Sequence, residues 1–295
     1  SRTTWTFSFW VKKADLSDDP CIWSGYRSGS SLDTFVMGSG GSHFYVYLSS
    51  YKGQLKPNGV QRDPTSWYHY VTTWDTTNST AADRMRIYIN GERVSLATDD
   101  QPSEDEVSNI GLALTVMNIG QQGDTTQFGS FYLADMIFTD GTSYSASDFG
   151  ETNAATNQWV PKDPSGLSFG TNGFWFKFEN SSDLGEDYSG NGNDYAANGL
   201  YASDQNPDTP TTNICYLNPL SIGVEKGANV ALSQGNLVSL TTYAGWEEVL
   251  GTQYVSSGKW YAECLTYSNY LMIGVAASNH SPPATSIATD GAYGW

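Results

Sequence analysis

The most constraining feature of this sequence is a period-two alternation of apolar and polar residues in many short segments. In residues 4–12, Trp5, Phe7, Phe9 and Val11 alternate with mostly polar residues. A β-strand points successive side chains to opposite faces, so this pattern predicts a strand with one face in a core. Similar segments, each bounded by turn-forming residues, lie at 34–38, 43–50, 67–75, 84–96, 113–120, 130–141 and 174–178. Many short, regularly spaced strands predict an all-β sandwich.

Asn90 and Gly91 mark a tight hairpin between two of these segments. A type I′ turn needs positive φ at both central residues, which Asn and Gly tolerate. We therefore expect the strand around residues 87–89 to pair antiparallel with the one around residues 94–96.

Two breaks in the alternation organise the chain. Residues 150–170 gain Asn, Pro and Ser, which predicts a long excursion from the sheet. Residues 202–228 are rich in Pro and Asn without periodicity, and we interpret them as a linker. It would join a first sandwich, residues 1–201, to a second β-domain, residues 229–295. About 70 residues are few for a two-layer sandwich, so we expect the second domain to be truncated or to pack against another surface.

The charge and the cysteines exclude several classes of partner and site. Thirty-one acidic residues against 14 Lys and Arg give a formal net charge of -17. Such a chain repels nucleic-acid phosphates and anionic membranes, so we expect neither as a partner. Cys21, Cys215 and Cys264 match neither a disulfide framework nor a CxxC metal pair. No apolar run reaches the roughly 18 residues that a membrane helix needs.

Several motifs carry a family resemblance. The segments WTFSFWVKK, SWYHYVTTWD, RIYINGERV, FYLADMIFTDG and DYSGNGND resemble those of a laminin-G or concanavalin A-like jelly-roll domain. Their order, continued through LNPL near residue 220, resembles a group of bacteriophage virion proteins over roughly residues 3–220. After the linker, SSGKWYAECLT, IGVAA and GAYGW resemble the first half of a SPRY domain, a β-sandwich that binds protein partners.

The resemblance implies an antiparallel jelly-roll sandwich followed by an incomplete SPRY-like sandwich. It also implies a non-enzymatic virion surface protein, such as a fibre, a spike or a capsid decoration protein. Its lectin-like domain would bind other virion subunits, a host surface glycan, or both, and fibres and spikes are commonly homo-trimers. Assembly in the host cytoplasm agrees with the lack of a disulfide framework. A bacterial extracellular adhesion module is an alternative with the same binding chemistry.

A polysaccharide-degrading enzyme is the competing class, because laminarinase-like enzymes resemble this fold. They carry E-x-D-x-x-E or E-x-D-x-E on one strand, where two carboxylates act as nucleophile and acid. The sequence has no such run, and the acid-rich residues 99–107 are typical of a solvated loop. A serine or cysteine hydrolase needs a base beside its nucleophile. We interpret His69, one of three histidines, as a partly buried strand residue, so we expect no enzyme activity.

The glycine-rich stretch GEDYSGNGNDY, residues 185–195, is compatible with two local structures. Counting from Asp187, it resembles the first half of a D-x-[DN]-x-[DN]-G calcium loop, but position 12 is Asn198 instead of a bidentate Glu. The alternative is a turn in which Asp and Asn side chains accept hydrogen bonds from nearby backbone amides. If Ca²⁺ binds, its candidate ligands are Asp187, Ser189, Asn191, Asn193, Asp194 and Asp183, with Asp135 or Asp140 from other segments.

Carbohydrate sites combine a stacking aromatic ring with neutral or acidic hydrogen-bonding groups. Three aromatic residues near Asp and Asn are candidates for this role: Trp10, Trp175 and Tyr195. Trp10 falls on the otherwise polar face of its strand, where it could also lie beneath a neighbouring loop.

Overall fold

The computed structural model describes residues 2–14, 20–27, 30–38, 43–48, 52–61, 63–110, 116–122, 128–222, 230–241, 248–253, 259, 261–266, 273–275 and 293–294. The chain divides into two compact units, Ser1–Asn213 and Ile214–Trp295. Strands account for 41% of the structure and helices for 4%, and the strands pair antiparallel, which confirms the predicted all-β class.

The first unit contains fourteen strands and three short 3-10 helices among its described residues. The strands are β1 (Thr4–Lys13), β2 (Cys21–Arg27), β3 (Ser30–Gly38), β4 (His43–Leu48), β5 (Gly53–Pro57), β6 (Tyr68–Asp75), β7 (Met85–Ile89), β8 (Glu92–Arg93), β9 (Leu96–Asp100), β10 (Val116–Ile119), β11 (Phe131–Asp140), β12 (Gly150–Thr152), β13 (Trp159–Pro161) and β14 (Phe174–Phe176). The helices are η1 (Ala81–Asp83), η2 (Ala146–Asp148) and η3 (Ala202–Asp204).

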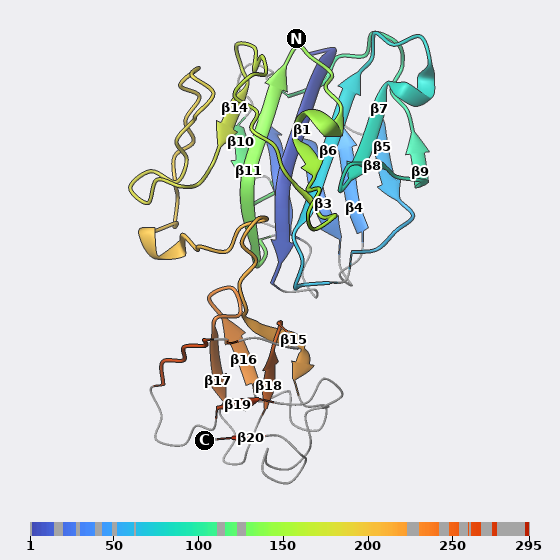
Figure 1. The fold of residues 1–295 in the computed structure, drawn as a ribbon. Coiled ribbons are helices and arrows are strands. Elements are labelled where there is room, and N and C mark those ends of the chain that lie inside the picture. Colours follow the sequence, from blue (N-terminus) through green and yellow to red (C-terminus); the bar gives the residue numbers. More distant parts are fainter. Residues whose placement is uncertain are drawn as a thin grey trace. The chain divides into compact units, whose positions relative to one another are not determined.

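Two six-stranded sheets face each other across the core of this unit (Figure 1). Sheet A has the order β14-β11-β1-β6-β7-β8, and sheet B has the order β10-β2-β3-β4-β5-β9. Aromatic rings fill the space between them: Trp5 stacks on Trp74 with ring centroids 6.0 Å apart, and Phe7 from sheet A lies 4.5 Å from Trp23 of sheet B. The arrangement is the predicted jelly-roll, concanavalin-like sandwich.

The predicted hairpin is confirmed, with one difference in its second strand. Asn90 and Gly91 have φ of 49° and 86°, and β7 pairs with β8 through Tyr88 with Arg93 and Ile89 with Glu92. The second strand then ends, and residues from Leu96 onward form β9 in the other sheet. Three strands of sheet B, β2, β5 and β9, have no clear alternation and were not predicted.

Strand β1 is buried on both faces, whereas its sequence predicted burial on one. The outer face of sheet A is covered by residues 144–169, which include the β12–β13 hairpin. Phe149, Phe169 and Trp159 from this segment pack against Val71 and Ile137 of the sheet. The predicted excursion at 150–170 is therefore a cover for the sheet.

The second unit contains three separate two-stranded sheets in the part of it that is described. Trp260, Ala262 and Cys264 alternate with Tyr261, Glu263 and Leu265, a pattern that predicts a strand. Residues 261–266 form no strand there, and Tyr261 and Leu265 are 85% and 75% exposed. Trp260 lies outside the described residues. The strands of this unit are β15 (Leu217–Ile222), β16 (Val230–Ser233), β17 (Val238–Thr241), β18 (Val249–Gly251), β19 (Gly274–Val275) and β20 (Tyr293–Gly294).

The predicted linker, residues 202–228, has no single structural counterpart. Its first part, up to Asn213, belongs to the first unit, where Asp208 is only 5% exposed. Its later part contains β15 of the second unit. The physical reason is an ion pair that fastens Asp208 to Lys12 of β1, a contact between residues far apart in the sequence.

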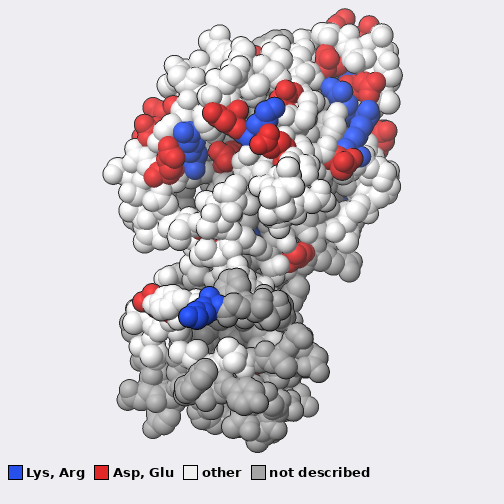
Figure 2. All heavy atoms as spheres, in the orientation of Figure 1, with Lys and Arg blue, Asp and Glu red and all other residues white. Residues whose placement is uncertain are grey.

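Acidic and basic side chains are interspersed on the face of the first unit drawn in Figure 2, where blue groups have red neighbours. Arg84 with Glu104 and Arg93 with Asp83 are two such exposed or partly exposed pairs, at 3.0 and 2.7 Å. Within the described residues, no helix is long and apolar enough to cross a membrane. The three cysteines are free thiols.

Candidate functional site

Trp10, the first predicted sugar-stacking residue, lies inside the protein. Its side chain is 2% exposed, and its ring stacks on that of His69 with centroids 4.7 Å apart. The cover formed by residues 144–169 lies over this face of sheet A, so Trp10 cannot present its ring to a ligand. Of the two alternatives for Trp10, the structure therefore supports burial beneath a neighbouring segment and not a stacking platform.

His69 makes two hydrogen bonds that fix its protonation. The Trp159 indole N–H donates to Nδ1 over 2.9 Å, so Nδ1 carries no proton. The neutral imidazole is then protonated at Nε2, which donates to Ser8 Oγ at 2.8 Å. Burial lowers the pKa of His69 to about 3. Nε2 therefore cannot take a proton from Ser8, and this buried Ser–His pair is not a hydrolase dyad.

The glycine-rich stretch is a turn organised by the Asp187 carboxylate. Its Oδ1 accepts hydrogen bonds from the backbone N–H groups of Trp175 and Ser189 at 2.9 and 2.8 Å. Its Oδ2 accepts from the N–H of Asn193 and the hydroxyl of Ser189 at 2.9 and 2.8 Å. Burial would raise the pKa of Asp187, but these hydrogen bonds outweigh it and lower the pKa. Both carboxylate oxygens are thus engaged with this chain's own donors.

The other candidate calcium ligands are also engaged in local hydrogen bonds. The side-chain amides of Asn191 and Asn193 both donate to the Gly173 carbonyl, at 2.9 and 2.8 Å. Asp194 accepts from the Asp187 N–H at 2.9 Å, and Asp183 from the Gly185 N–H at 3.2 Å.

Two further carboxylates were predicted as calcium ligands from outside the stretch. Asp140 accepts from the side chain of Asn172 at 2.6 Å, and Asp135 accepts from the Trp175 indole. The described residues contain no group of three or more His, Cys, Asp or Glu side chains placed to hold a metal ion. The hydrogen bonds are those expected of the turn, and the calcium site stays a prediction.

Tyr195, another predicted carbohydrate residue, packs against the core. Its ring lies 4.9 Å from Phe176 and 5.4 Å from Phe174 between centroids. Its hydroxyl accepts a hydrogen bond from the Trp23 indole at 3.4 Å, and burial raises its pKa to about 12. These contacts make Tyr195 a structural residue at the edge of the sandwich.

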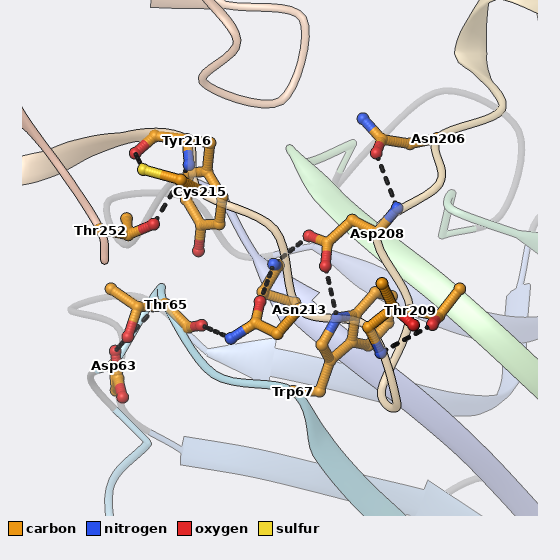
Figure 3. Close-up of polar contacts among 12 residues, drawn as sticks. Asp63, Thr65, Trp67, Asn206, Asp208, Thr209, Asn213, Cys215, Tyr216 and Thr252 are labelled. Carbon is orange, nitrogen blue, oxygen red and sulfur yellow. Dashed lines mark hydrogen bonds and ion pairs between the residues drawn. The ribbon is translucent and has the colours of Figure 1, made fainter. Parts of the chain in front are cut away.

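A buried lysine forms the most unusual polar cluster of the first unit (Figure 3). The Lys12 side chain is fully buried, and its ammonium group forms an ion pair with Asp208 and donates to Asn213 Oδ1 at 2.8 Å. It also lies 5.5 Å from the ring centroids of both Trp67 and Tyr132. The Trp67 indole donates to Asp208 at 3.2 Å, a hydrogen bond marked by a dashed line in Figure 3.

The Lys12 cluster has a structural role. Burial lowers the pKa of Lys12, although the hydrogen bond and charge of Asp208 act in the opposite direction. A buried lysine with a lowered pKa is also a feature of catalytic amines. Here, however, Lys12 has no solvent access and its ammonium group is shared among four partners. The cluster fastens residues 206–213 to the sandwich.

Trp175 is the predicted carbohydrate residue that remains at the surface. Strand β14 pairs with β11 through Trp175 and Ile137, and directs Phe174 and Phe176 into the core. The alternation therefore places Trp175 on the outer side of sheet A, half-buried. Its ring is nearly parallel to that of Phe169, at 6.4 Å and 10°.

The glycine-rich turn brings a second aromatic ring to this place. The Tyr188 N–H donates to the Trp175 carbonyl at 2.8 Å, next to the hydrogen bond between the Trp175 N–H and Asp187. The rings of Trp175 and Tyr188 meet edge to face, with centroids 6.4 Å apart. The ammonium group of Lys177 lies 4.4 Å from the first centroid and 4.6 Å from the second.

Carboxylates surround these rings. Asp135 Oδ1 accepts from the Trp175 indole at 3.1 Å, Glu186 accepts from the Tyr188 hydroxyl at 3.0 Å, and Glu179 lies 3.5 Å from Lys177. Burial raises the pKa of Asp135, while Trp175 and Lys177 lower it. Partial desolvation, followed by Glu186 and Glu179, raises the pKa of Tyr188 to about 12.

We call the group formed by Trp175, Tyr188, Lys177, Asp135 and Glu179 the Trp175 surface. It combines ring faces with charged hydrogen-bonding groups, which is the composition of a site for a small polar ligand. Sequence reasoning found Trp175 but missed Tyr188, because only the folded turn brings that ring beside β14. It predicted Asp135 as a metal ligand, whereas the structure shows it holding an indole.

Residues 1–136 match the family model described as the concanavalin A-like lectin/glucanases superfamily. No curated protein sequence matches the chain. A heptameric SAP-like pentraxin from Limulus polyphemus is similar over 55% of this chain and 80% of its own, with 16% identity and a TM-score of 0.37. A Bacteroides ovatus protein described as a "putative carbohydrate binding protein" is similar over 61% of this chain and 46% of its own, with 14% identity and a TM-score of 0.41.

The receptor binding domain of botulinum neurotoxin mosaic serotype C/D is similar over 62% of this chain and 49% of its own. The identity is 13% and the TM-score is 0.32. The chain therefore spans less than half of the lengths of the Bacteroides and botulinum proteins.

Proposed function

We propose that the first unit is a non-enzymatic, lectin-like module that binds a glycan at the Trp175 surface. The observation that carries this proposal is the half-buried Trp175 ring beside Tyr188, bordered by Asp135 and Glu179. Sugars stack their apolar faces on such rings and donate hydroxyl hydrogens to carboxylates. The family match of residues 1–136 supports a lectin-type sandwich.

The same observations support a binding role over catalysis. A glycoside hydrolase needs two carboxylates about 5–10 Å apart, flanking one bond. Asp135 accepts from the Trp175 indole at 3.1 Å and Glu179 pairs with Lys177, contacts that orient these carboxylates beside the rings as hydrogen-bond acceptors. The buried pair of Ser8 and His69 has no access to a substrate.

The proposal places this module on the surface of a bacteriophage virion, in a fibre, a spike or a capsid decoration protein. The order of sequence motifs through residue 220 supports this context. The chain would then be assembled in the host cytoplasm and would contact other virion subunits as a homo-oligomer, such as a trimer. The second unit, with its SPRY-like sequence, would be the part that contacts protein partners.

A glycan array with the full chain tests the binding role. We expect binding to a defined set of glycans and a loss of about 3- to 10-fold or more in affinity for W175A, because ring stacking is removed. Tyr201→Ala is the matched control, since Tyr201 is an aromatic residue of the same unit that is 70% exposed. A blank array with the intact assembly would contradict glycan binding and leave a purely architectural role.

The other assignments have separate tests. Reducing-sugar release from laminarin, agar or carrageenan would overturn the non-enzymatic assignment. A structure of the native particle tests the virion context: we expect density for this chain at the particle surface. Its absence from purified particles would contradict that context and favour a bacterial adhesion module.

A further inference from the structure

The Trp175 surface already contains a cation, contributed by its own chain. The Lys177 ammonium group lies 4.4 Å from the Trp175 centroid and 4.6 Å from the Tyr188 centroid. The two rings meet at 66°, so they form two walls of a corner around the charge. Ammonium groups within about 6 Å of aromatic ring centroids are attracted by the negative ring faces.

We propose that this corner is a binding site for an organic cation, and that Lys177 is its internal, exchangeable occupant. The ligand class is an amine or quaternary ammonium group, such as the free amine of an amino sugar or a choline-type group. This inference rests on the proposed function in taking the same surface as the binding site, and it specifies the charge of the ligand.

The charges around the corner favour a cation. Glu179 lies 3.5 Å from Lys177, and Glu186 accepts from the Tyr188 hydroxyl. The negative charges of Glu179 and Asp163 also act on Asp135, where they raise the pKa of its carboxyl group. Four carboxylates therefore act on the corner, and the ammonium group of Lys177 balances only part of their charge. This negative charge would not attract a neutral sugar, whereas it would attract a cationic group.

The backbone of Asp135 explains how its carboxylate reaches the corner. Asp135 has φ of 44°, an uncommon conformation for a residue other than glycine. It lies at an irregularity of β11, where the pairing with β1 shifts between Ser8 with Ile137 and Trp10 with Ala134. Such bulges redirect a side chain, and here the carboxylate is directed to the Trp175 indole.

Lys177 is held weakly enough to be displaced. Its side chain is 28% exposed, and its ion-pair partner Glu179 is 57% exposed. Ion pairs at exposed positions contribute little to stability, because water and salt screen them. A ligand ammonium group can therefore replace that of Lys177 while the stem of Lys177 moves into solvent.

Titration calorimetry of the full chain at low salt tests the proposal, with glucosamine, N-acetylglucosamine and choline as probes. Lys177→Ala removes the internal competitor, so we expect it to bind glucosamine and choline about 3- to 30-fold more tightly than the unmodified chain. Lys52→Ala is the control: it removes the same charge from another exposed ion pair, Lys52 with Glu106, and should change neither affinity. We expect W175A to bind neither cation.

The outcomes separate this inference from glycan binding in general. Equal affinities of the unmodified chain and K177A, or equal binding of glucosamine and N-acetylglucosamine, would overturn the cation site while glycan binding stands. Binding of choline and glucosamine with a blank glycan array would support the cation site and contradict the proposed glycan role. Failure of K177A to bind any cationic probe would overturn the cation site.

Discussion

Acidification should destabilise the first unit through His69 before most carboxylates titrate. The His69 imidazole is fully buried and neutral, and burial lowers its pKa to about 3. An unfolded histidine has a pKa of about 6.5. Below pH 6.5 the unfolded chain therefore takes up a proton that the folded chain does not. The stability that His69 provides is complete above pH 6.5 and decreases as the pH falls toward 3.

The size of this effect follows from proton linkage. One proton of difference between the two states changes the free energy of unfolding by about 1.4 kcal/mol per pH unit. Between pH 6.5 and pH 4.5 the contribution of His69 should fall by about 2.3 kcal/mol, because the imidazole is titrated only in the unfolded chain over this range. That is a large share of the 5–15 kcal/mol typical of a domain.

Urea unfolding at pH 6.5, 5.5 and 4.5 measures this effect when the unmodified chain is compared with H69Q. Glutamine can accept from the Trp159 indole and donate to Ser8, but it does not titrate. The plot of the free energy of unfolding against pH should therefore be less steep for H69Q, by the slope that corresponds to about one proton. The other titrating groups are common to both chains, and their effects cancel in the difference. Parallel curves for the two chains over this range would refute the assignment of a neutral, buried His69.

Two further substitutions test the other polar clusters. Lys12→Met leaves the Asp208 carboxylate buried without its counter-charge and should lower the free energy of unfolding by about 3–5 kcal/mol, whereas K12M/D208L should recover much of this loss. If urea denaturation shows that the costs of the two single substitutions simply add in the double variant, the two residues do not interact as a pair. Asp187→Asn removes an acceptor site facing the Asn193 N–H and should lower the free energy of unfolding by about 1–3 kcal/mol at pH 7. The pKa of Asp187 is lowered in the folded state, so its ionised carboxylate stabilises the fold less below about pH 3.9, and the cost of the substitution should be smaller there. The melting temperature should be the same in excess calcium and with a chelator, and a rise with calcium would show a metal site.

Local pattern was enough to predict much of the sandwich. The alternation at Trp5, Phe7 and Phe9 identified β1 because, in a strand, the polarity of each residue indicates whether its face of the sheet is buried. Asn90 and Gly91 identified the hairpin because their backbone conformations, φ of 49° and 86°, are a local property of those residue types. Both signals depend on neighbours within a few residues.

Other features depend on contacts that no local pattern records. The burial of Trp10 and His69 requires Trp159, which comes from a segment without alternation. A Cβ atom at Gly91 would lie only 2.8 Å from the Trp159 ring, so the turn glycine also makes room for the cover. The ion pair of Lys12 with Asp208 joins one residue near the start of the first unit's sequence to another near its end.

The glycine-rich turn also determines how copies of this chain can assemble. Strand β14 is the last strand of sheet A, and its central residue, Trp175, has its outward N–H and carbonyl bound by Asp187 and Tyr188. At the opposite edge, β8 is two residues long and consists of Glu92 and Arg93. Neither edge offers a free row of backbone groups for another strand to join. Sheet A is therefore closed to the addition of a further strand at both of its edges.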